Sequence, residues 1–430
     1  RWTTDERRLP VERVHFIGIG GAGMAPLAAI LLEHGAVVTG SDREANAKTA
    51  ELARHGAVMH IGHDAANLPP DATLAVYSSA VPESNPERRR AAELKIPQLR
   101  RGEFLAELTR QYRRLAAVSG SHGKTSVTAM LAHILVKAGL KPGFLIGAAV
   151  NGGASASAGA GNDIFVSEVD ESDATHTLVR PWLGIVPNVD DDHCWSVGGE
   201  AALRENFRRF GRQSQHLIYY AGPVADRLFA GHPDALRLER PPMDFALGRW
   251  HGFQAWNAQL AIAAAGRFGV APERALALLD DFPGVARRMS GHYASERLLV
   301  YEDYAHHPAE VASSNAAFRG RFPRCHLRVV FQPHRYARLA KYLPELAAEL
   351  GKADSVIVTP VFAAWSETGP VSGADLVAAT GAKARYLEGG WPEIAQKALE
   401  YDGAAPLLLA VIGAGDIEQI FHWLPGGENA

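Results

Sequence analysis

Cysteine is scarce in this chain of 430 residues, which contains only Cys194 and Cys325. Two thiols can build neither a disulfide framework nor a four-cysteine zinc site, and they fit a reducing compartment. An excess of one charge is also lacking, because 44 basic and 47 acidic side chains leave a net charge of −3. This balance argues against a polybasic nucleic-acid-binding protein.

Long apolar runs are missing as well. No run approaches the length of about 18 residues that a membrane-spanning helix needs. The first ten residues, RWTTDERRLP, are polar and lack the apolar centre of a secretory signal. We therefore expect a soluble, cytoplasmic protein that neither inserts into a membrane nor binds nucleic acid.

The composition is that of a globular protein, with 47% hydrophobic and 21% charged residues. Short apolar runs alternate with helical stretches, and this rhythm restarts after Arg101 and near Pro283. A β–α–β rhythm is typical of parallel sheets covered by helices. We predict an α/β fold with three domains, at residues 1–102, 103–285 and 286–430.

The apolar pattern predicts individual elements within this frame. Strands are expected at 14–19, 36–39, 74–76, 115–118, 164–169, 183–186, 298–301, 327–331, 355–359 and 407–412, and helices at 25–33, 103–113, 127–138 and 337–350. Residues 147–161 are rich in glycine, alanine and serine. This composition favours a mobile surface loop, with a ligand cradle as the alternative.

A first glycine-rich turn follows the G-x-G-x-x-G pattern between a predicted strand and a predicted helix. It consists of Gly18, Ile19, Gly20, Gly21, Ala22 and Gly23. Such a turn brings backbone N–H groups close to a diphosphate at the helix N-terminus. Asp42, at the end of the next predicted strand, is suited to a ribose hydroxyl. The pattern predicts a nucleotide diphosphate, but it does not separate NAD, FAD and UDP.

A second glycine-rich turn joins another predicted strand to a helix. It consists of Gly120, Ser121, His122, Gly123, Lys124 and Thr125, followed by Ser126. This is a shortened P-loop, in which backbone amides surround phosphate oxygens, the lysine reaches the β- and γ-phosphates, and the threonine hydroxyl ligates Mg²⁺. The turn predicts ATP binding.

Acidic side chains follow two neighbouring predicted strands. Residues 168–173 (EVDESD) contain four carboxylates, and residues 188–193 (NVDDDH) end in His193. A solvated acidic turn is the usual interpretation of such a run, but its place beside the P-loop favours Mg²⁺ binding, with Glu168 as a ligand. His193 is either a ligand of a second metal or an ordinary exposed histidine.

Two phosphate loops in one chain indicate a particular kind of chemistry. A dehydrogenase needs only the first loop, and a simple kinase needs only the second. An enzyme that uses ATP on a nucleotide-linked substrate needs both.

With these motifs the chain resembles the Mur ligases, the ATP-dependent amide-forming enzymes of peptidoglycan precursor synthesis. The similar segments run in order: HFIGIGGAGM at 15–24, GSD at 40–42, SSAV at 78–81, NPE at 85–87, GSHGKT, EVDESD, NVDDDH, NAQLAIAAA at 257–265, GVARR at 284–288, DYAHHPAE at 303–310 and FQPHRYAR at 331–338. The resemblance implies a Rossmann-like UDP-binding domain, a central P-loop ATPase domain and a Rossmann-like C-terminal domain. It is greatest for the branch that joins L-alanine to the carboxylate of UDP-N-acetylmuramate through an acyl phosphate.

The resemblance also implies roles for individual residues. Lys124, Glu168 and His193 would serve catalysis, with Thr125, Glu168 and His193 holding Mg²⁺. Asn257, Arg288 and Asp303 would join the P-loop in binding ATP. The first glycine turn, Asp42 and Ser79 would bind the UDP substrate, and the amino-acid pocket would contain Tyr304, His306, Arg335 and Arg338.

Other interpretations of these residues remain open from the sequence alone. His306 and His307 could be a helix-entry pair before Pro308, Tyr304 could be a core tyrosine, and the two arginines could be ordinary surface cations. At the level of the whole protein, the alternatives are a divergent Mur ligase that adds another amino acid or a peptide, a nicotinamide dehydrogenase, and a non-catalytic nucleotide-binding regulator. The departures from the family pattern, such as His176 where phenylalanine is usual, lie around the substrate and the adenine.

Overall fold

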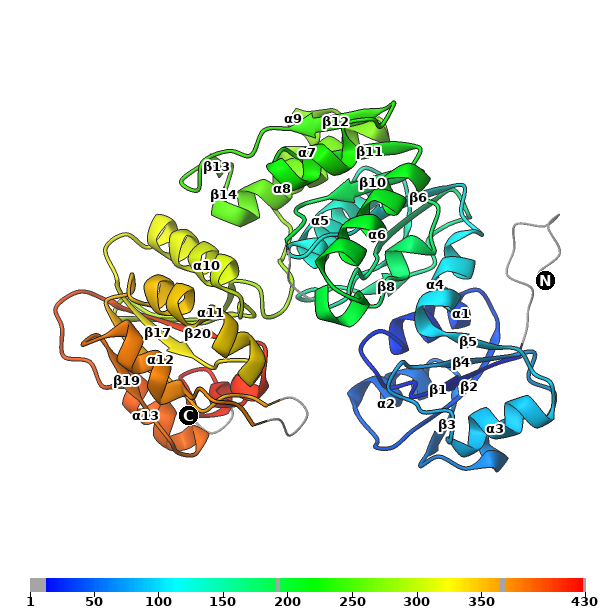
Figure 1. Cartoon of the computed structure of the whole chain (residues 1–430), viewed down its shortest axis with the longest axis horizontal. Coiled ribbons are helices and arrows are strands. Elements are labelled where there is room, and N and C mark those ends of the chain that lie inside the picture. Colours follow the sequence, from blue (N-terminus) through cyan, green and yellow to red (C-terminus); the bar gives the residue numbers. More distant parts are fainter. Residues whose placement is uncertain (1–12, 191–193, 364–367, 428–430) are drawn as a thin grey trace. The chain divides into compact units, whose positions relative to one another are not determined.

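The structure is a computed structural model that describes residues 13–190, 194–363 and 368–427. It divides into two compact units, one formed by Arg1–Arg240 with Asn257–Pro283 and the other by Pro241–Trp256 with Gly284–Ala430. The first unit holds a five-stranded and a seven-stranded sheet, and the second holds a six-stranded sheet and a two-stranded ribbon (Figure 1). The predicted α/β class with parallel sheets is confirmed. Within the described ranges, no helix is both long and apolar enough to span a membrane.

The five-stranded sheet has the order β3-β2-β1-β4-β5, and all its strand pairs are parallel. Its elements are β1 (Arg13–Ile17), α1 (Ala25–Glu33), β2 (Val37–Asp42), α2 (Ala47–Arg54), β3 (Val58–Ile61), η1 (Ala65–Asn67), β4 (Leu74–Tyr77), α3 (Pro86–Glu93), β5 (Gln98–Arg100) and the following α4 (Arg101–Thr109). The strand order reverses between β1 and β4. In open α/β sheets, the crevice at such a switch point is where ligands bind.

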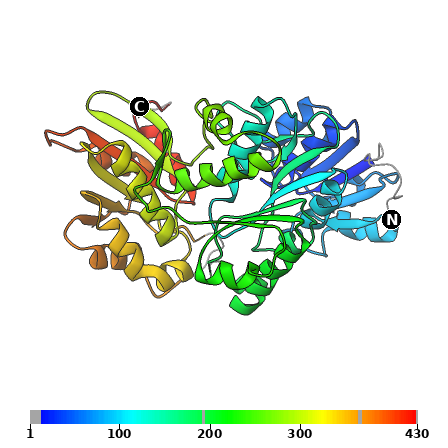
Figure 2. The same cartoon turned by 90° about the horizontal axis from the view of Figure 1, so that it is seen from above.

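The seven-stranded sheet has the order β12-β11-β10-β6-β9-β7-β8, with only β7 and β8 antiparallel. Its elements, which Figure 2 shows from above in cyan to green, are β6 (Arg114–Val118), α5 (Lys124–Lys137), β7 (Gly143–Leu145), β8 (Ala156–Ser157), β9 (Ile164–Glu168), η2 (Thr175–Thr177), β10 (Leu183–Val186), η3 (Cys194–Val197), α6 (Glu200–Gln213), β11 (His216–Tyr220), α7 (Pro223–Phe229), β12 (Ala235–Leu238), α8 (Gly252–Arg267) and α9 (Pro272–Leu278). The inner strands are continuous apolar runs because both their faces are buried. The two-residue strand β8 lies within residues 147–161, the segment for which a mobile surface loop was expected. The glycine-, alanine- and serine-rich composition of this segment does not predict the pairing of β8 with β7.

One continuous hydrophobic core joins the two sheets of the first unit. Phe16 of β1 meets Phe104 of α4 edge to face at 5.7 Å between ring centroids, and Tyr112 packs against Phe165 of β9 at 4.6 Å. The Tyr112 hydroxyl donates a hydrogen bond to the carbonyl of Ala158 at 3.0 Å. The two glycine-rich turns therefore belong to one packed body.

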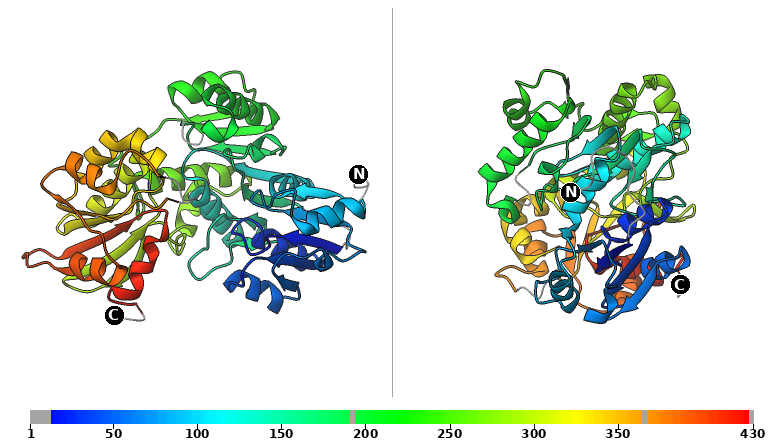
Figure 3. Two further views of the ribbon diagram at one scale, coloured as in Figure 1. Left: turned by 60° about the horizontal axis from the view of Figure 1, so that its bottom comes forward. Right: turned by 90° about the vertical axis from the view of Figure 1, so that its right-hand side faces the viewer.

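The second unit, drawn mostly in yellow to red in Figure 3, is built on a six-stranded sheet of order β15-β16-β20-β17-β18-β19. Hydrophobic clusters lie on the two faces of this sheet. Its elements are β13 (Ala246–Leu247), β14 (Trp250–His251), β15 (Ser290–Ala294), β16 (Leu298–Asp303), α10 (Pro308–Arg321), β17 (His326–Phe331), α11 (Tyr336–Leu350), β18 (Ser355–Val358), α12 (Gly373–Thr380), β19 (Ala384–Tyr386), α13 (Trp391–Leu399), β20 (Leu407–Ile412) and η4 (Asp416–Trp423). Helix α11, predicted at 337–350, is kinked at Tyr342. Pro344 explains the kink, because its ring lacks an N–H and clashes with the preceding turn.

Candidate active site

The P-loop connects β6 to α5. Strand β6 is the central strand of the seven-stranded sheet. Gly123 has the left-handed φ of +83°, which favours glycine. A Cβ atom at Gly123 would also lie 2.7 Å from the Asn257 side-chain oxygen. Helix α5 begins at Lys124 with its first N–H groups free of intrahelical partners, as an anion site requires.

The end of β10 holds the P-loop in place. The backbone N–H of His122 donates to Asn188 Oδ1 at 2.8 Å, and Asn188 Nδ2 donates back to the His122 carbonyl at 3.0 Å. The backbone N–H of Asp190 donates to Ser121 Oγ at 2.9 Å. The first residues of the segment 188–193, in which His193 was a candidate ligand of a second metal, thus hold the P-loop by hydrogen bonds. His193 lies outside the described residues.

Lys124 is held by a buried carboxylate. Its Nζ donates to Glu171 Oε2 and to the Gly120 carbonyl, both at 2.7 Å. The Glu171 side chain is fully buried, whereas that of Lys124 is 17% exposed. Burial lowers the pKa of the ammonium group, but the charges of Glu171, Asp170 and Glu168 outweigh this effect and leave the pKa raised. Lys124 is therefore a preorganised cation at the phosphate loop.

Thr125 and Glu168 form the pair that the sequence predicted as Mg²⁺ ligands. Thr125 Oγ1, in the first turn of α5, donates to Oε2 of Glu168, the last residue of β9, at 2.8 Å. Within the ranges that the structure describes, no three His, Cys, Asp or Glu side chains form a metal cluster. A hydroxyl and one carboxylate still fit Mg²⁺, which takes one or two protein oxygens and completes its shell with phosphate oxygens and water.

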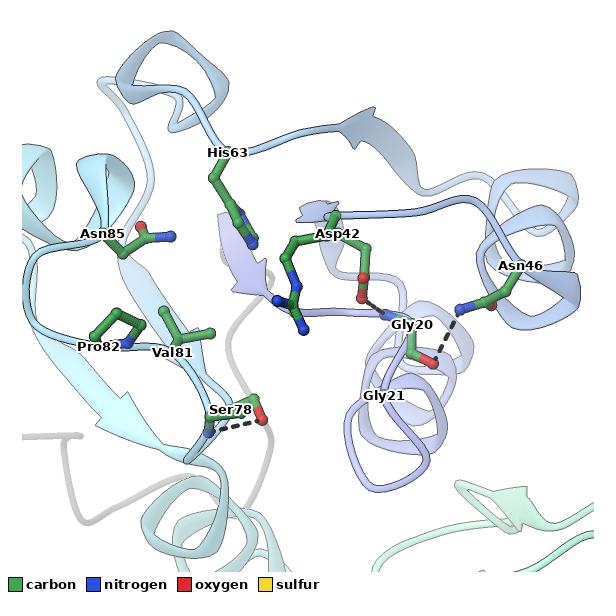
Figure 4. Close-up of a pocket in the computed structure, with 12 residues that line it drawn as sticks. Gly20, Gly21, Asp42, Asn46, His63, Ser78, Val81, Pro82 and Asn85 are labelled. Carbon is green, nitrogen blue, oxygen red and sulfur yellow. Dashed lines mark hydrogen bonds between the residues drawn. The ribbon is translucent and has the colours of Figure 1, made fainter. Parts of the chain in front are cut away.

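A cavity of about 330 Å³ lies at the switch point of the five-stranded sheet (Figure 4). It is lined by Gly18, Gly20, Gly21, Asp42, Arg43, Asn46, His63, Ser78, Ala80, Val81, Pro82 and Asn85. The predicted residues Ala22, Gly23 and Ser79 are not in this lining. Asp42 accepts a hydrogen bond from the backbone N–H of Gly20 at 2.8 Å, so its carboxylate orders the turn as well as facing the cavity.

Several polar residues of this cavity were not predicted. Asn46 and Asn85 are the N-caps of α2 and α3, and His63 follows β3. N-cap chemistry could have marked the two asparagines as helix starts, but it does not distinguish a binding residue. His63 carries no local signal, because its place in the cavity depends on the pairing of β3 with β2.

The proposed amino-acid residues gather at the carboxyl ends of β16 and β17 in the second unit. Arg338 is buried, and its Nη1 donates to His334 Nδ1 at 2.9 Å. The rings of His306 and His334 lie 5.6 Å apart, and those of Tyr304 and His306 lie 5.7 Å apart. His334, which was not predicted as a site residue, thus contacts both Arg338 and His306.

Two neighbours of this cluster have local structural roles. His307 is the N-cap of α10, where its side chain accepts from the Ala309 N–H at 3.3 Å, as expected for a helix-entry histidine. Arg335 has a φ of +67° and is the N-cap residue of α11. This strained backbone conformation lies between β17 and Arg338, at the start of the helix that carries Arg338.

The residues expected to reach ATP from outside the P-loop lie in different units. Asn257 touches the loop within the first unit, whereas Arg288 and Asp303 belong to the second. Asp303 is buried and accepts from the N–H groups of Met289 and Ala305 at 2.9 and 3.0 Å. Burial raises the pKa of its carboxyl group. A joint contact of these residues with ATP stays a prediction.

Two phosphate-type turns at the ends of parallel strands, with a lysine, a threonine and a carboxylate at the second, define a nucleotide-binding α/β protein. Comparison with family models makes the class specific. Residues 13–113 match the model described as "Mur ligase family, catalytic domain", and residues 287–415 match "Mur ligase, glutamate ligase domain". The chain belongs to the Mur ligase family, which confirms the resemblance seen in the sequence.

Individual relatives are similar over most of the chain. The UDP-N-acetylmuramate–L-alanine ligase of Acidithiobacillus ferrooxidans is 34% identical over 458 aligned positions, covering 95% of this chain and 96% of that protein. The ligase of the same name from Methylococcus capsulatus is 34% identical, covering 85% and 84%. The crystal structure of the UDP-N-acetylmuramate-alanine ligase of Thermotoga maritima has a TM-score of 0.77 at 26% identity, covering 95% and 97%. A murein peptide ligase of Psychrobacter arcticus shares the fold, with a TM-score of 0.65 at 23% identity.

Proposed function

We propose that this protein is an ATP-dependent ligase that joins L-alanine to the carboxylate of UDP-N-acetylmuramate in peptidoglycan precursor synthesis. The relatives that match almost its whole length carry this activity in their names. The observation that supports the proposal most directly is the P-loop in which Lys124 and Thr125 each face a carboxylate, in the same unit as a separate cavity at a glycine turn. Because ATP and nucleotide-linked sugars are cytosolic metabolites, we place the enzyme in the cytoplasm.

The chemistry requires activation of a poor electrophile. An oxygen of the substrate carboxylate attacks the γ-phosphorus of ATP, the bond to the bridging oxygen breaks, and ADP leaves. The neutral amine of L-alanine then attacks the carbonyl carbon of the acyl phosphate. The tetrahedral adduct loses phosphate and a proton and becomes the amide. The protein contributes mainly by positioning the reactants and by stabilising charge on the transferred phosphoryl group.

The P-loop would hold the ATP phosphates. In this proposal Lys124 turns from Glu171 toward the γ-phosphate, a short change because its ammonium already lies at the mouth of the loop. Thr125 and Glu168 would hold Mg²⁺, which neutralises phosphate charge when bound. Asn257, Arg288 and Asp303 would complete the ATP site.

The amino-acid pocket would lie around Arg338. A guanidinium group forms paired hydrogen bonds with a carboxylate, which suits the free carboxylate of an α-amino acid. Tyr304, His306 and Arg335 would form the rest of the pocket, and His334 would hold Arg338 in place through its 2.9 Å contact.

The test is phosphate release from ATP in the presence of UDP-N-acetylmuramate and one amine at a time. L-alanine should support the highest kcat/KM, with glycine, L-serine and the tripeptide used in recycling as comparisons. Equal phosphate release without any amine would indicate hydrolysis only. Activity confined to another amine would overturn the assignment of L-alanine while leaving the ligase chemistry intact.

A further inference from the structure

Two residues of the motifs described above have no role in the function described so far: His15, in the segment HFIGIGGAGM, and Glu87, in the segment NPE. They meet in the interior of the five-stranded domain. His15 Nε2 lies 2.7 Å from Glu87 Oε2, and both side chains are fully buried. The other nitrogen of His15, Nδ1, lies 2.7 Å from Thr39 Oγ1 on β2.

Glu87 is the centre of a larger buried network. Ser41 Oγ donates to Glu87 Oε2 at 2.6 Å, and His63 Nδ1 lies 2.8 Å from Glu87 Oε1. The partners come from β1, β2 and the segment after β3, while Glu87 itself lies in the first turn of α3. A carboxylate is favoured in that turn by the exposed N–H groups of the helix.

The network keeps Glu87 ionised. Burial by itself would raise the pKa of this carboxyl group, but hydrogen bonds from His15, Ser41 and His63 outweigh burial and leave the pKa lowered. An ionised carboxylate can only accept hydrogen bonds. Each histidine nitrogen that faces Glu87 must therefore carry a proton.

This requirement sets the tautomer of His63. With Nδ1–H directed at Glu87, the neutral ring has Nε2 as its unprotonated nitrogen, which is an acceptor. His63 lines the cavity at the switch point, and Figure 4 shows its ring between Asp42 and Asn85. The side chain of His63 is 19% exposed, whereas that of Glu87 is fully buried. Glu87 is not part of the cavity lining, and His63 connects its carboxylate to that lining.

We propose that Glu87 is a positioning residue for the nucleotide substrate, which holds His63 in the Nδ1–H tautomer so that Nε2 accepts a hydrogen bond from an N–H or O–H group of the nucleoside. The inference rests on the proposed function in one respect, namely that the cavity binds the UDP part of the substrate. His15 and Thr39 complete the chain of buried hydrogen bonds that orients the carboxylate.

The main test compares variants by calorimetric binding of UDP-N-acetylmuramate and by steady-state kinetics. Glu87→Gln should weaken binding about tenfold and raise the KM for this substrate in proportion, because a preorganised hydrogen bond is lost. The KM for ATP and kcat at saturation should not change. Glu93→Gln, an exposed change on the same helix, is the matched control and should bind like the wild type.

A double-mutant cycle separates positioning from general stability. If Glu87 acts through His63, His63→Ala should weaken binding, and adding Glu87→Gln should have no further effect. A further tenfold loss in the double variant would overturn the proposal, as would unchanged binding by a folded Glu87→Gln variant.

A spectroscopic measurement on the wild type avoids any failure of Glu87→Gln to fold. NMR of the histidine ring nitrogens should show His63 as the Nδ1–H tautomer, and the Nε2–H tautomer would contradict the proposal. If the wild type bound no UDP nucleotide, the proposed function would fail. The tautomer would still report whether Glu87 holds His63.

Discussion

Replacing Lys124 with alanine tests the P-loop most severely, because one change removes both the partner of the buried Glu171 and the charge that we propose for catalysis. Glu171 would lose the ammonium that lies 2.7 Å away and would remain fully buried without it. Breaking a buried ion pair costs about 3–5 kcal/mol. Since the Lys124 side chain is 17% exposed, we expect the lower end, about 3 kcal/mol. For a body of this size, that loss lowers Tm by about 6–12 °C.

The same variant should lose ligation by a different mechanism. Without the ammonium, the transferred phosphoryl group lacks one preorganised partner, and removal of such a group typically lowers kcat by about 10²–10³. A coupled assay for ADP, run at a temperature where the variant is folded, measures this loss. Binding of UDP-N-acetylmuramate should persist, because the cavity that we assign to it lies at the other sheet.

A second change separates the two effects. The double variant Lys124→Ala with Glu171→Gln has no unpaired buried carboxylate at position 171. Its Tm should therefore return most of the way to the wild-type value, while its ligase activity stays low. Recovery of activity together with Tm would show that Lys124 acts only on the fold. Wild-type turnover in the single variant would refute the assigned role outright.

Three further outcomes are expected. Gly20→Ala should weaken binding of UDP-N-acetylmuramate about tenfold in calorimetry but spare ATP binding, because a Cβ there would lie 2.6 Å from Asn46 Nδ2; unchanged binding would remove this turn from the site. Arg338→Lys should raise the KM for L-alanine about tenfold and leave that for ATP unchanged, since lysine lacks the planar fork; equal rises in both would argue against an amino-acid pocket. Burial lowers the pKa of His176 to about 4. Below about pH 6.5 the unfolded chain therefore binds a proton at this side chain, whereas the native protein does not. The free energy of unfolding should consequently fall by about 3 kcal/mol between pH 6.5 and pH 4. In His176→Phe, the free energy of unfolding, measured by denaturant titration at each pH, should depend less on pH over this range. An unchanged dependence on pH would contradict a buried, neutral His176.

The parts of the site that the sequence predicted are those with short-range signatures. The P-loop from Gly120 to Thr125 and the acidic residues after β9 lie directly behind apolar strands, so one pattern supplied both the element and the chemistry. Strand β10 was predicted at its observed bounds, Leu183–Val186, because a strand buried on both faces is a continuous apolar run.

Long-range neighbours escaped prediction for a physical reason. His63 and Glu87 are 24 positions apart, and Glu87 meets His15 across 72 positions. These contacts depend on which strands become neighbours, and no local spacing encodes that choice. His334 likewise has no local signal, because its proximity to His306 depends on how the strands are ordered in the sheet.

The central claim is that two different nucleotides occupy one chain at separate sites. Equilibrium binding of UDP-N-acetylmuramate and a non-hydrolysable ATP analogue, each titrated alone and then in the presence of the other at saturation, tests it most directly. We predict one equivalent of each per chain, with neither displacing the other. Mutual displacement, or a total of one bound nucleotide, would contradict it.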